Sequence, residues 1–194
     1  MNKDMHAAKG RLFIISGPSG AGKSTILGAI LKQRPQLRYS ISFTTRLPRG
    51  DEKDGVEYHF VSEAAFRQKI DKGEFAEWAE VHGHLYGTSA TWVEEVVAQG
   101  LDILFDIDVQ GAKRLSAKYP QAISVFIAPP SIEVLEKRLL KRGVDSSDAV
   151  ARRLKNARAE MARADDYDHV LVNDDLAQTV SNLESIIEQA SVNG

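Results

Sequence analysis

Gly17-Pro18-Ser19-Gly20-Ala21-Gly22-Lys23-Ser24 matches the pattern G-x-x-x-x-G-K-[ST] at every fixed position. The apolar run Leu12-Phe13-Ile14-Ile15 comes just before this stretch and predicts a buried strand. After the stretch, apolar residues recur with helical spacing at Ile26, Leu27, Ile30 and Leu31. A strand, a glycine-rich loop and a helix in this order form the context in which the pattern acts as a phosphate-binding P-loop.

The residue types of this loop suit the phosphates of a nucleotide. Glycines let the backbone approach a phosphate, successive N–H groups form an anion nest, and the following helix adds positive partial charge. Lys23 has the reach for the β- and γ-phosphates and a catalytic role, and the Ser24 hydroxyl can ligate Mg²⁺. The alternative is a glycine-rich turn with a surface lysine, which the flanking strand and helix disfavour. The predicted ATP-binding residues of the loop are Gly17, Pro18, Ser19, Gly20, Ala21, Gly22, Lys23, Ser24 and Thr25.

The composition is that of an ordinary water-soluble protein. The chain has 194 residues, 43% of them hydrophobic and 27% charged, which predicts one domain, with or without inserted lobes. The net charge of −2 gives no reason to expect a nucleic acid or a membrane as partner. The absence of cysteine excludes disulfides and Cys-based zinc sites and suits a cytoplasmic location. Residues 1–10 are polar, and we expect a loose tail there.

Strand and helix patterns alternate along most of the chain, which favours a parallel α/β sheet flanked by helices. Apolar runs predict further core strands at residues 103–108, 123–128 and 170–172. Helices are expected over about 110–118, from 131 to 143, over about 149–164, and from 176 to about 190. Ser131 is the expected N-cap of the second of these helices.

Residues 39–99 interrupt this rhythm with short strands. Strands are predicted at 56–61, 75–81 and 85–86, and helices at about 63–72 and 90–99. We therefore expect a lobe of short strands, inserted between two strands of the core.

The middle of the chain resembles the guanylate kinase family. The lobe carries Ser42-x-Thr44-Thr45-Arg46-x-Pro48-Arg49, Gly55-x-x-Tyr58-x-Phe60, Glu74-Phe75-x-Glu77-Trp78 and Tyr86-Gly87-Thr88. The core carries Asp106-Ile107-Asp108-x-Gln110-Gly111, Ile127-Ala128-Pro129-Pro130-Ser131 and Val172-Asn173-Asp174-Asp175. The resemblance runs from about residue 11 to 190. It implies a P-loop NTPase-type core, an inserted GMP-binding lobe and a helical lid. It also implies the reaction ATP + GMP ⇌ ADP + GDP, which belongs to purine nucleotide metabolism and uses Mg²⁺ as cofactor.

The same resemblance divides the chain into functional parts. The implied core comprises residues 11–38, 100–135 and 165–194, the GMP-binding lobe comprises 39–99, and the lid with its adjoining helix comprises 136–164. Two departures concern only the lobe: Leu85 stands where the family often has an aromatic residue, and His82 and His84 differ from the commoner residues of their turn.

The resemblance assigns the acceptor phosphate to two arginines, Arg46 and Arg49, completed by the hydroxyls of Tyr58 and Tyr86. Guanidinium groups suit a phosphate dianion because they hold it bidentately and stay charged. In a lone arginine pair, solvated surface charges would be the simpler interpretation.

Recognition of guanine is implied for Glu77, whose carboxylate suits the adjacent N1–H and N2–H₂ donors of the base. The resemblance adds Ser42 and Thr88 on the remaining polar edges, and Asp108 near the acceptor nucleotide. An exposed strand glutamate remains the alternative for Glu77, and a pair of acid–base carboxylates remains one for the Asp-x-Asp sequence.

Further residues are implied for the metal, the lid and the adenine. Asp106 ends an apolar strand, as a Walker-B aspartate does, and would hold Mg²⁺ together with Ser24. The lid would bring Arg138, Arg142 and Arg153 to the transferring phosphoryl group. Asn173 resembles a residue that contacts adenine, although it also suits a turn.

Two rival functions use the same scaffold. A ribosyl-bisphosphate phosphokinase would keep the P-loop but lose the guanine-binding set, and a phosphopeptide-binding module would have a degraded P-loop. Both sets of residues are intact in this chain. Besides GMP, dGMP is expected as an acceptor.

Overall fold

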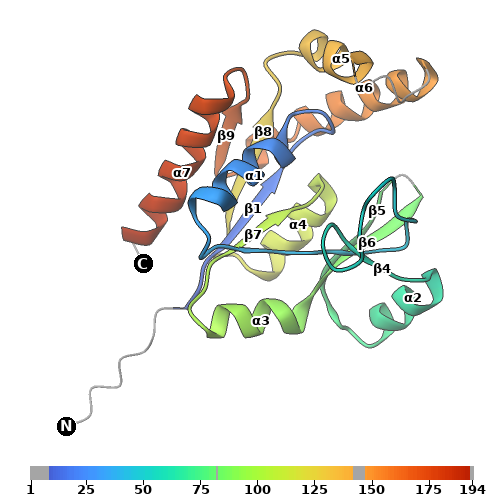
Figure 1. Ribbon diagram of the computed structural model, residues 1–194, viewed down its shortest axis with the longest axis vertical. Coiled ribbons are helices and arrows are strands. Elements are labelled where there is room, and N and C mark those ends of the chain that lie inside the picture. The colour runs from blue at the N-terminus through green and yellow to red at the C-terminus, as the bar shows by residue number, and fades with distance from the viewer. Residues whose placement is uncertain (1–8, 82, 142–146, 193–194) are drawn as a thin grey trace. The chain divides into compact units, whose positions relative to one another are not determined.

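The computed structural model describes residues 9–81, 83–141 and 147–192 (Figure 1). Its helices and strands group into two compact units. One unit comprises residues 9–12, Gln36–Phe105 and Gln110–Ala122, and the other comprises Phe13–Pro35, Asp106–Val109 and the chain from Ile123 onwards. Each unit is described separately below. The expected tail up to residue 8, His82, Arg142 and the loop residues up to 146 lie outside the described residues.

The P-loop unit is built on parallel strands. Strand β8 (Ile123–Ala128) lies between β1 (Leu12–Ser16) and β9 (His169–Val172) and is parallel to both. All residues of β1 are buried, as its apolar run predicts. The Asp168 carboxylate accepts hydrogen bonds from the backbone N–H and the hydroxyl of Ser124, which fixes the start of β9 beside β8.

Helices α1 (Lys23–Gln33) and α7 (Leu176–Val192) pack against each other in this unit (Figure 1). Arg34, at the C-cap of α1, forms ion pairs with Glu184 and Glu188 of α7. A short 3₁₀ helix, Ala164–Asp166, leads into β9.

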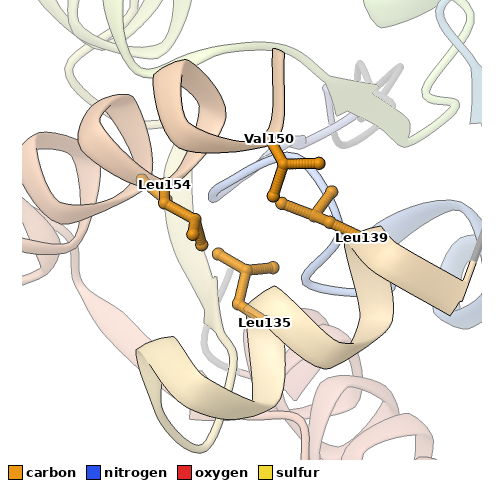
Figure 2. Packing of buried hydrophobic residues seen from close by; sticks show 5 residues of the cluster. Leu135, Leu139, Val150 and Leu154 are labelled. Atoms are coloured by element: carbon orange, nitrogen blue, oxygen red, sulfur yellow. The ribbon is translucent and has the colours of Figure 1, made fainter. Parts of the chain in front are cut away.

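The predicted lid region forms two helices that share a small apolar cluster. Helix α5 (Ile132–Lys141) contributes Leu135 and Leu139, and α6 (Ser147–Met161) contributes Val150, Leu154 and Ala157 (Figure 2). All of these side chains are buried. The Ser131 hydroxyl accepts a hydrogen bond from the Val134 N–H at 3.2 Å, so the predicted N-cap is confirmed.

The other unit contains a mixed sheet in the order β4-β3-β6-β5. Strand β3 (Phe43–Thr44) is parallel to β4 (His59–Phe60) and antiparallel to β6 (His84–Ser89), which is antiparallel to β5 (Phe75–Val81). Helix α2 (Glu63–Asp71) buries Phe66 against Phe75 and Leu85 of this sheet. The same unit holds the parallel pair β2 (Arg38–Tyr39) and β7 (Ile103–Asp106), and helices α3 (Ala90–Ala98) and α4 (Val109–Lys118).

Two predicted strands are shorter than their sequence patterns indicate. The strand expected at 56–61 is reduced to His59–Phe60, because Gly55 and Tyr58 are hydrogen-bonded to each other in a turn and only the following residues reach β3. The strand expected at 103–108 ends at Asp106. Asp108 therefore lies beyond the strand.

Candidate active site

The P-loop follows β1 and wraps onto the N-terminus of α1. Gly17 and Gly22 have φ values of 138° and 95°, which L side chains rarely adopt. A Cβ at Gly17 would lie 2.2 Å from the Ile127 carbonyl oxygen. Gly22 is the N-cap of α1 and offers no side chain to the first turn, which leaves this helix N-terminus suited to an anion.

Lys23 is held against the loop that precedes it. Its ammonium donates a hydrogen bond to the Gly17 carbonyl at 2.7 Å and lies 3.9 Å from an Asp106 carboxylate oxygen. Burial raises the pKa of Asp106, and the positive charge of Lys23 opposes that rise. The P-loop lysine and the predicted Walker-B aspartate are thus neighbours, while Ser24 and Thr25 are exposed at the start of α1.

Arg138 and Asn173 close one side of the P-loop. The Asn173 amide donates to the Ala21 carbonyl at 2.6 Å, and Arg138 donates to the Asn173 carbonyl at 2.9 Å. These residues line a pocket of about 360 Å³ that also includes Gly20, Thr25 and Leu176. This pocket, open beside the phosphate loop, has the size and position for part of a nucleotide.

The other arginines of the predicted lid differ in their surroundings. Arg153 is half-buried on α6, whereas Arg152 beside it is exposed. Arg142 lies outside the described residues.

Two further titratable residues of this unit were missed by sequence reasoning. Burial raises the pKa of Glu160, with the Asp108 carboxylate adding to the rise and Lys23 opposing it. Burial also raises the pKa of Tyr167 to about 12. Both residues follow the predicted lid motifs in the chain, and no local pattern marks them, because their environment is created by tertiary contacts.

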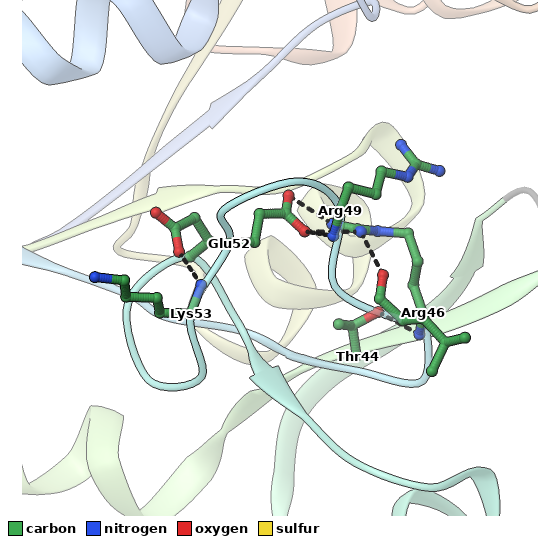
Figure 3. A network of polar contacts seen from close by, with 7 residues as sticks. Thr44, Arg46, Arg49, Glu52 and Lys53 are labelled. Carbon is green, nitrogen blue, oxygen red and sulfur yellow. Dashed lines mark hydrogen bonds and ion pairs between the residues drawn. The ribbon is translucent and has the colours of Figure 1, made fainter.

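Arg46 is the buried centre of a polar network in the other unit. Its side chain is only 7% exposed, so the alternative of a solvated surface charge is wrong for this residue. The Glu52 carboxylate binds the guanidinium through both oxygens, at 2.9 Å from Nη1 and 3.0 Å from Nη2 (Figure 3). The hydrogen bond with Glu52 raises the pKa of Arg46 further above its usual range, and burial opposes this.

The other predicted phosphate ligands surround this guanidinium. The carbon atom of the Arg46 guanidinium lies 5.2 Å from the centre of the Tyr58 ring. The Tyr58 and Tyr86 rings meet edge to face at 5.7 Å. Arg49 follows in the same loop and is exposed (Figure 3). The structure therefore brings Arg46, Tyr58 and Tyr86 together.

Glu77 lies on β5 directly opposite Thr88 on β6. Thr88 donates a hydrogen bond to the Glu77 carboxylate at 2.8 Å, and the two side chains are 0% and 6% exposed respectively. The register that pairs Phe43 with Gly87 places Ser42, also buried, beside Thr88. The alternative of an exposed strand glutamate is wrong, and the three residues predicted to read guanine form one buried polar group.

A profile of the guanylate kinase family matches residues 9–190.

The chain belongs to the guanylate kinase family.

Named relatives and a solved structure agree with this membership. The guanylate kinase of Dechloromonas aromatica is 48% identical over 183 residues, which cover 94% of this chain and 91% of the relative. That of Symbiobacterium thermophilum is 50% identical over 179 residues, which cover 92% and 85% respectively. The crystal structure of guanylate kinase from Anaplasma phagocytophilum is 32% identical and superposes with a TM-score of 0.78, covering 96% of this chain and 88% of that one. The predicted α/β fold and family are thereby confirmed.

Two further kinds of feature concern the described part of this guanylate kinase family member: clusters of metal-ligating side chains and membrane-spanning helices. Within residues 9–81, 83–141 and 147–192, no three His, Asp or Glu side chains gather in a way that could hold an ion. Of the two histidines that depart from the family pattern, His84 is half-buried and His82 is outside the described residues. In that same part of the chain, no helix has the length and apolar content needed to cross a bilayer.

Proposed function

We propose that this chain transfers the γ-phosphoryl group of ATP to GMP, giving ADP and GDP. The observation that carries the proposal is the buried Glu77 carboxylate with its Thr88 partner, in a chain that also has a complete P-loop. A buried carboxylate that accepts from N1–H and N2–H₂ of guanine would face an unpaired acceptor, N1, in adenine. The lobe thus selects GMP, while the P-loop binds the phosphates of ATP.

The donor site is assigned to the loop Gly17–Thr25 and to the neighbouring pocket. Main-chain N–H groups and Lys23 bind the β- and γ-phosphates, and the contact with adenine is assigned to Asn173. The Ser24 hydroxyl and the Asp106 carboxylate supply hard oxygen ligands, which fit Mg²⁺. When bound, Mg²⁺ would neutralise charge on the donor phosphates.

The acceptor site is assigned to residues 39–99. Arg46 and Arg49 bind the phosphate of GMP, with the hydroxyls of Tyr58 and Tyr86 as further donors. Ser42, Glu77 and Thr88 are assigned to the base, and the resemblance also assigns Asp108 to the acceptor nucleotide.

Transfer of the phosphoryl group needs positioning and charge stabilisation rather than a covalent enzyme intermediate. Lys23 and the lid arginines Arg138, Arg142 and Arg153 stabilise charge on the transferring group, while residues 136–164 close over it and exclude water. A catalytic role is also assigned to Arg46, whose positive charge binds the acceptor phosphate.

The test is release of ADP from Mg²⁺–ATP with GMP, dGMP, AMP, CMP, UMP or ribose 1,5-bisphosphate as acceptor. Turnover is expected with the guanine nucleotides. It should be lost in Lys23→Ala, while the circular dichroism spectrum of this variant should match that of the unmodified chain. Turnover with another acceptor but not GMP would overturn the assignment of the base-binding residues. A fully active Lys23→Ala variant would overturn the role of the P-loop.

A further inference from the structure

We propose that Glu52 is a positioning residue for the acceptor phosphate: it orients the Arg46 guanidinium and fixes the backbone that carries Arg49. This inference rests on the proposed function, in which the two arginines bind the phosphate of GMP. Glu52 itself would not touch the substrate.

The first argument is the way in which Glu52 binds the guanidinium. Its two oxygens occupy the edge of Arg46 formed by Nη1 and Nη2, and Nη1 also donates to the Leu47 carbonyl at 2.7 Å (Figure 3). A guanidinium has a second bidentate edge, formed by Nε and the other hydrogen of Nη2. Glu52 therefore occupies only the Nη1–Nη2 edge of Arg46 and sets the direction in which the second edge points. The Tyr86 hydroxyl, another predicted ligand of the phosphate, is also hydrogen-bonded to this guanidinium.

The second argument is that the guanidinium is also fixed across its plane. The Arg46 carbon Cζ lies 5.2 Å from the centre of the Tyr58 ring and 5.9 Å from that of Phe60. The side chain is almost fully buried. A buried cation is stable only when it is paired, so Glu52 lets Arg46 stay charged and immobile before any nucleotide binds.

The third argument concerns the loop from Arg49 to Glu52. The Arg49 N–H donates to the Glu52 carboxylate at 2.8 Å, and the Glu52 N–H donates to the Arg49 carbonyl at 3.1 Å. This reciprocal pair closes the turn through Gly50, whose φ is +55°. The same carboxylate thus fixes the side chain of one phosphate ligand and the main chain of the other.

A competing role for Glu52 predicts the opposite effect. If the carboxylate merely occupied the place of the phosphate, GMP would have to displace it, and its removal would strengthen GMP binding. If it positions the arginines, its removal weakens GMP binding. The sign of the change in KM for GMP therefore distinguishes the two roles.

The experiment compares Glu52→Gln with Glu57→Gln. Glu57 lies in the same loop and accepts one backbone hydrogen bond, from the Lys53 N–H at 2.8 Å, so its replacement removes the same charge. Loss of a charge-assisted contact predicts a KM for GMP raised about tenfold to a hundredfold in Glu52→Gln, with KM for ATP unchanged. Glu57→Gln is expected to keep the KM of the unmodified chain.

Two further variants keep the test decisive. Glu52→Asp retains the negative charge and the fold, and its KM for GMP should lie between those of the unmodified chain and Glu52→Gln. Arg46→Lys loses the bidentate edges and should raise KM for GMP, and combining it with Glu52→Gln should add less than the sum of the two effects.

Each result supports or overturns a named claim. A KM for GMP in Glu52→Gln that equals the Glu57→Gln value, or falls below it, would overturn the positioning role. If Arg46→Lys also left KM for GMP unchanged, the assignment of the phosphate to Arg46 would fail as well. Equal losses for GMP and ATP would make Glu52 a purely structural residue and would also overturn the proposal.

Discussion

Replacement of Glu77 by glutamine tests base recognition without a change in side-chain size. Thr88 can still donate to the glutamine carbonyl, so the hydrogen bond between β5 and β6 and the fold should persist. The negative charge and one acceptor oxygen are lost, and an N–H₂ group takes the place of that oxygen.

The expected rise in KM for GMP follows from the burial of the Glu77 side chain. Glu77 is only 6% exposed, so water cannot replace the lost acceptor. A hydrogen bond to a charged group contributes about 1.5–3 kcal/mol, and a buried donor left without an acceptor costs about 1–3 kcal/mol. The lower values together amount to about 2.5 kcal/mol, or roughly a 70-fold rise in KM for GMP.

The assay is steady-state ADP release with GMP varied at saturating ATP, and then with ATP varied at saturating GMP. Only the KM for GMP should rise. Glu80→Gln is the matched control, because Glu80 lies on the same strand and is exposed. An unchanged KM for GMP in Glu77→Gln would refute the assignment of Glu77 to the base, and an equal rise in Glu80→Gln would refute the argument from burial.

Three other predictions concern the P-loop unit. Gly22→Ala forces a left-handed residue to carry a Cβ 2.3 Å from the Asn173 amide nitrogen, so the free energy of unfolding should fall by about 1–3 kcal/mol and KM for ATP should rise; an unchanged urea midpoint would contradict this. Leu135→Ala opens the cluster shared by α5 and α6 and should lower the free energy of unfolding by about 2–5 kcal/mol in the same urea titration, whereas a loss below 1 kcal/mol would contradict tight packing there. Burial raises the pKa of Tyr167 to about 12. The stability that the protonated hydroxyl contributes should therefore be complete below the usual tyrosine pKa of about 10 and be lost as pH rises toward 12. The difference in unfolding free energy between the unmodified chain and Tyr167→Phe should change over that range, and a constant difference would contradict the buried hydroxyl.

The sequence predicted those parts of the fold in which local pattern and tertiary structure agree. Strand Ile123–Ala128 has the predicted bounds, because its apolar run is buried along β8 and a proline pair follows it. In the segment 56–61 apolar and polar residues alternate as in a strand, yet only His59–Phe60 pairs with β3. Alternation shows which face is apolar, but it does not show which backbone groups find a partner.

The candidate site divides in the same way. Lys23 was predicted because the P-loop pattern fixes its type and spacing, whereas Arg46 and Glu77 were predicted from the resemblance to the guanylate kinase family. Glu52 and Tyr167 were not predicted, because their importance arises only after folding. Glu52 binds the Arg46 guanidinium at both Nη atoms. Tyr167 is buried, and burial raises its pKa.

The cluster between α5 and α6 has a consequence for the proposed closure. Leu135 and Leu139 flank Arg138 on one helix, while Val150 and Leu154 flank Arg153 on the other. A core of this kind transmits displacement instead of absorbing it, because close-packed side chains resist shear. In the proposed closure the two helices would therefore move as one body, and Arg153 on α6 would shift together with α5, which already holds Arg138 beside the P-loop.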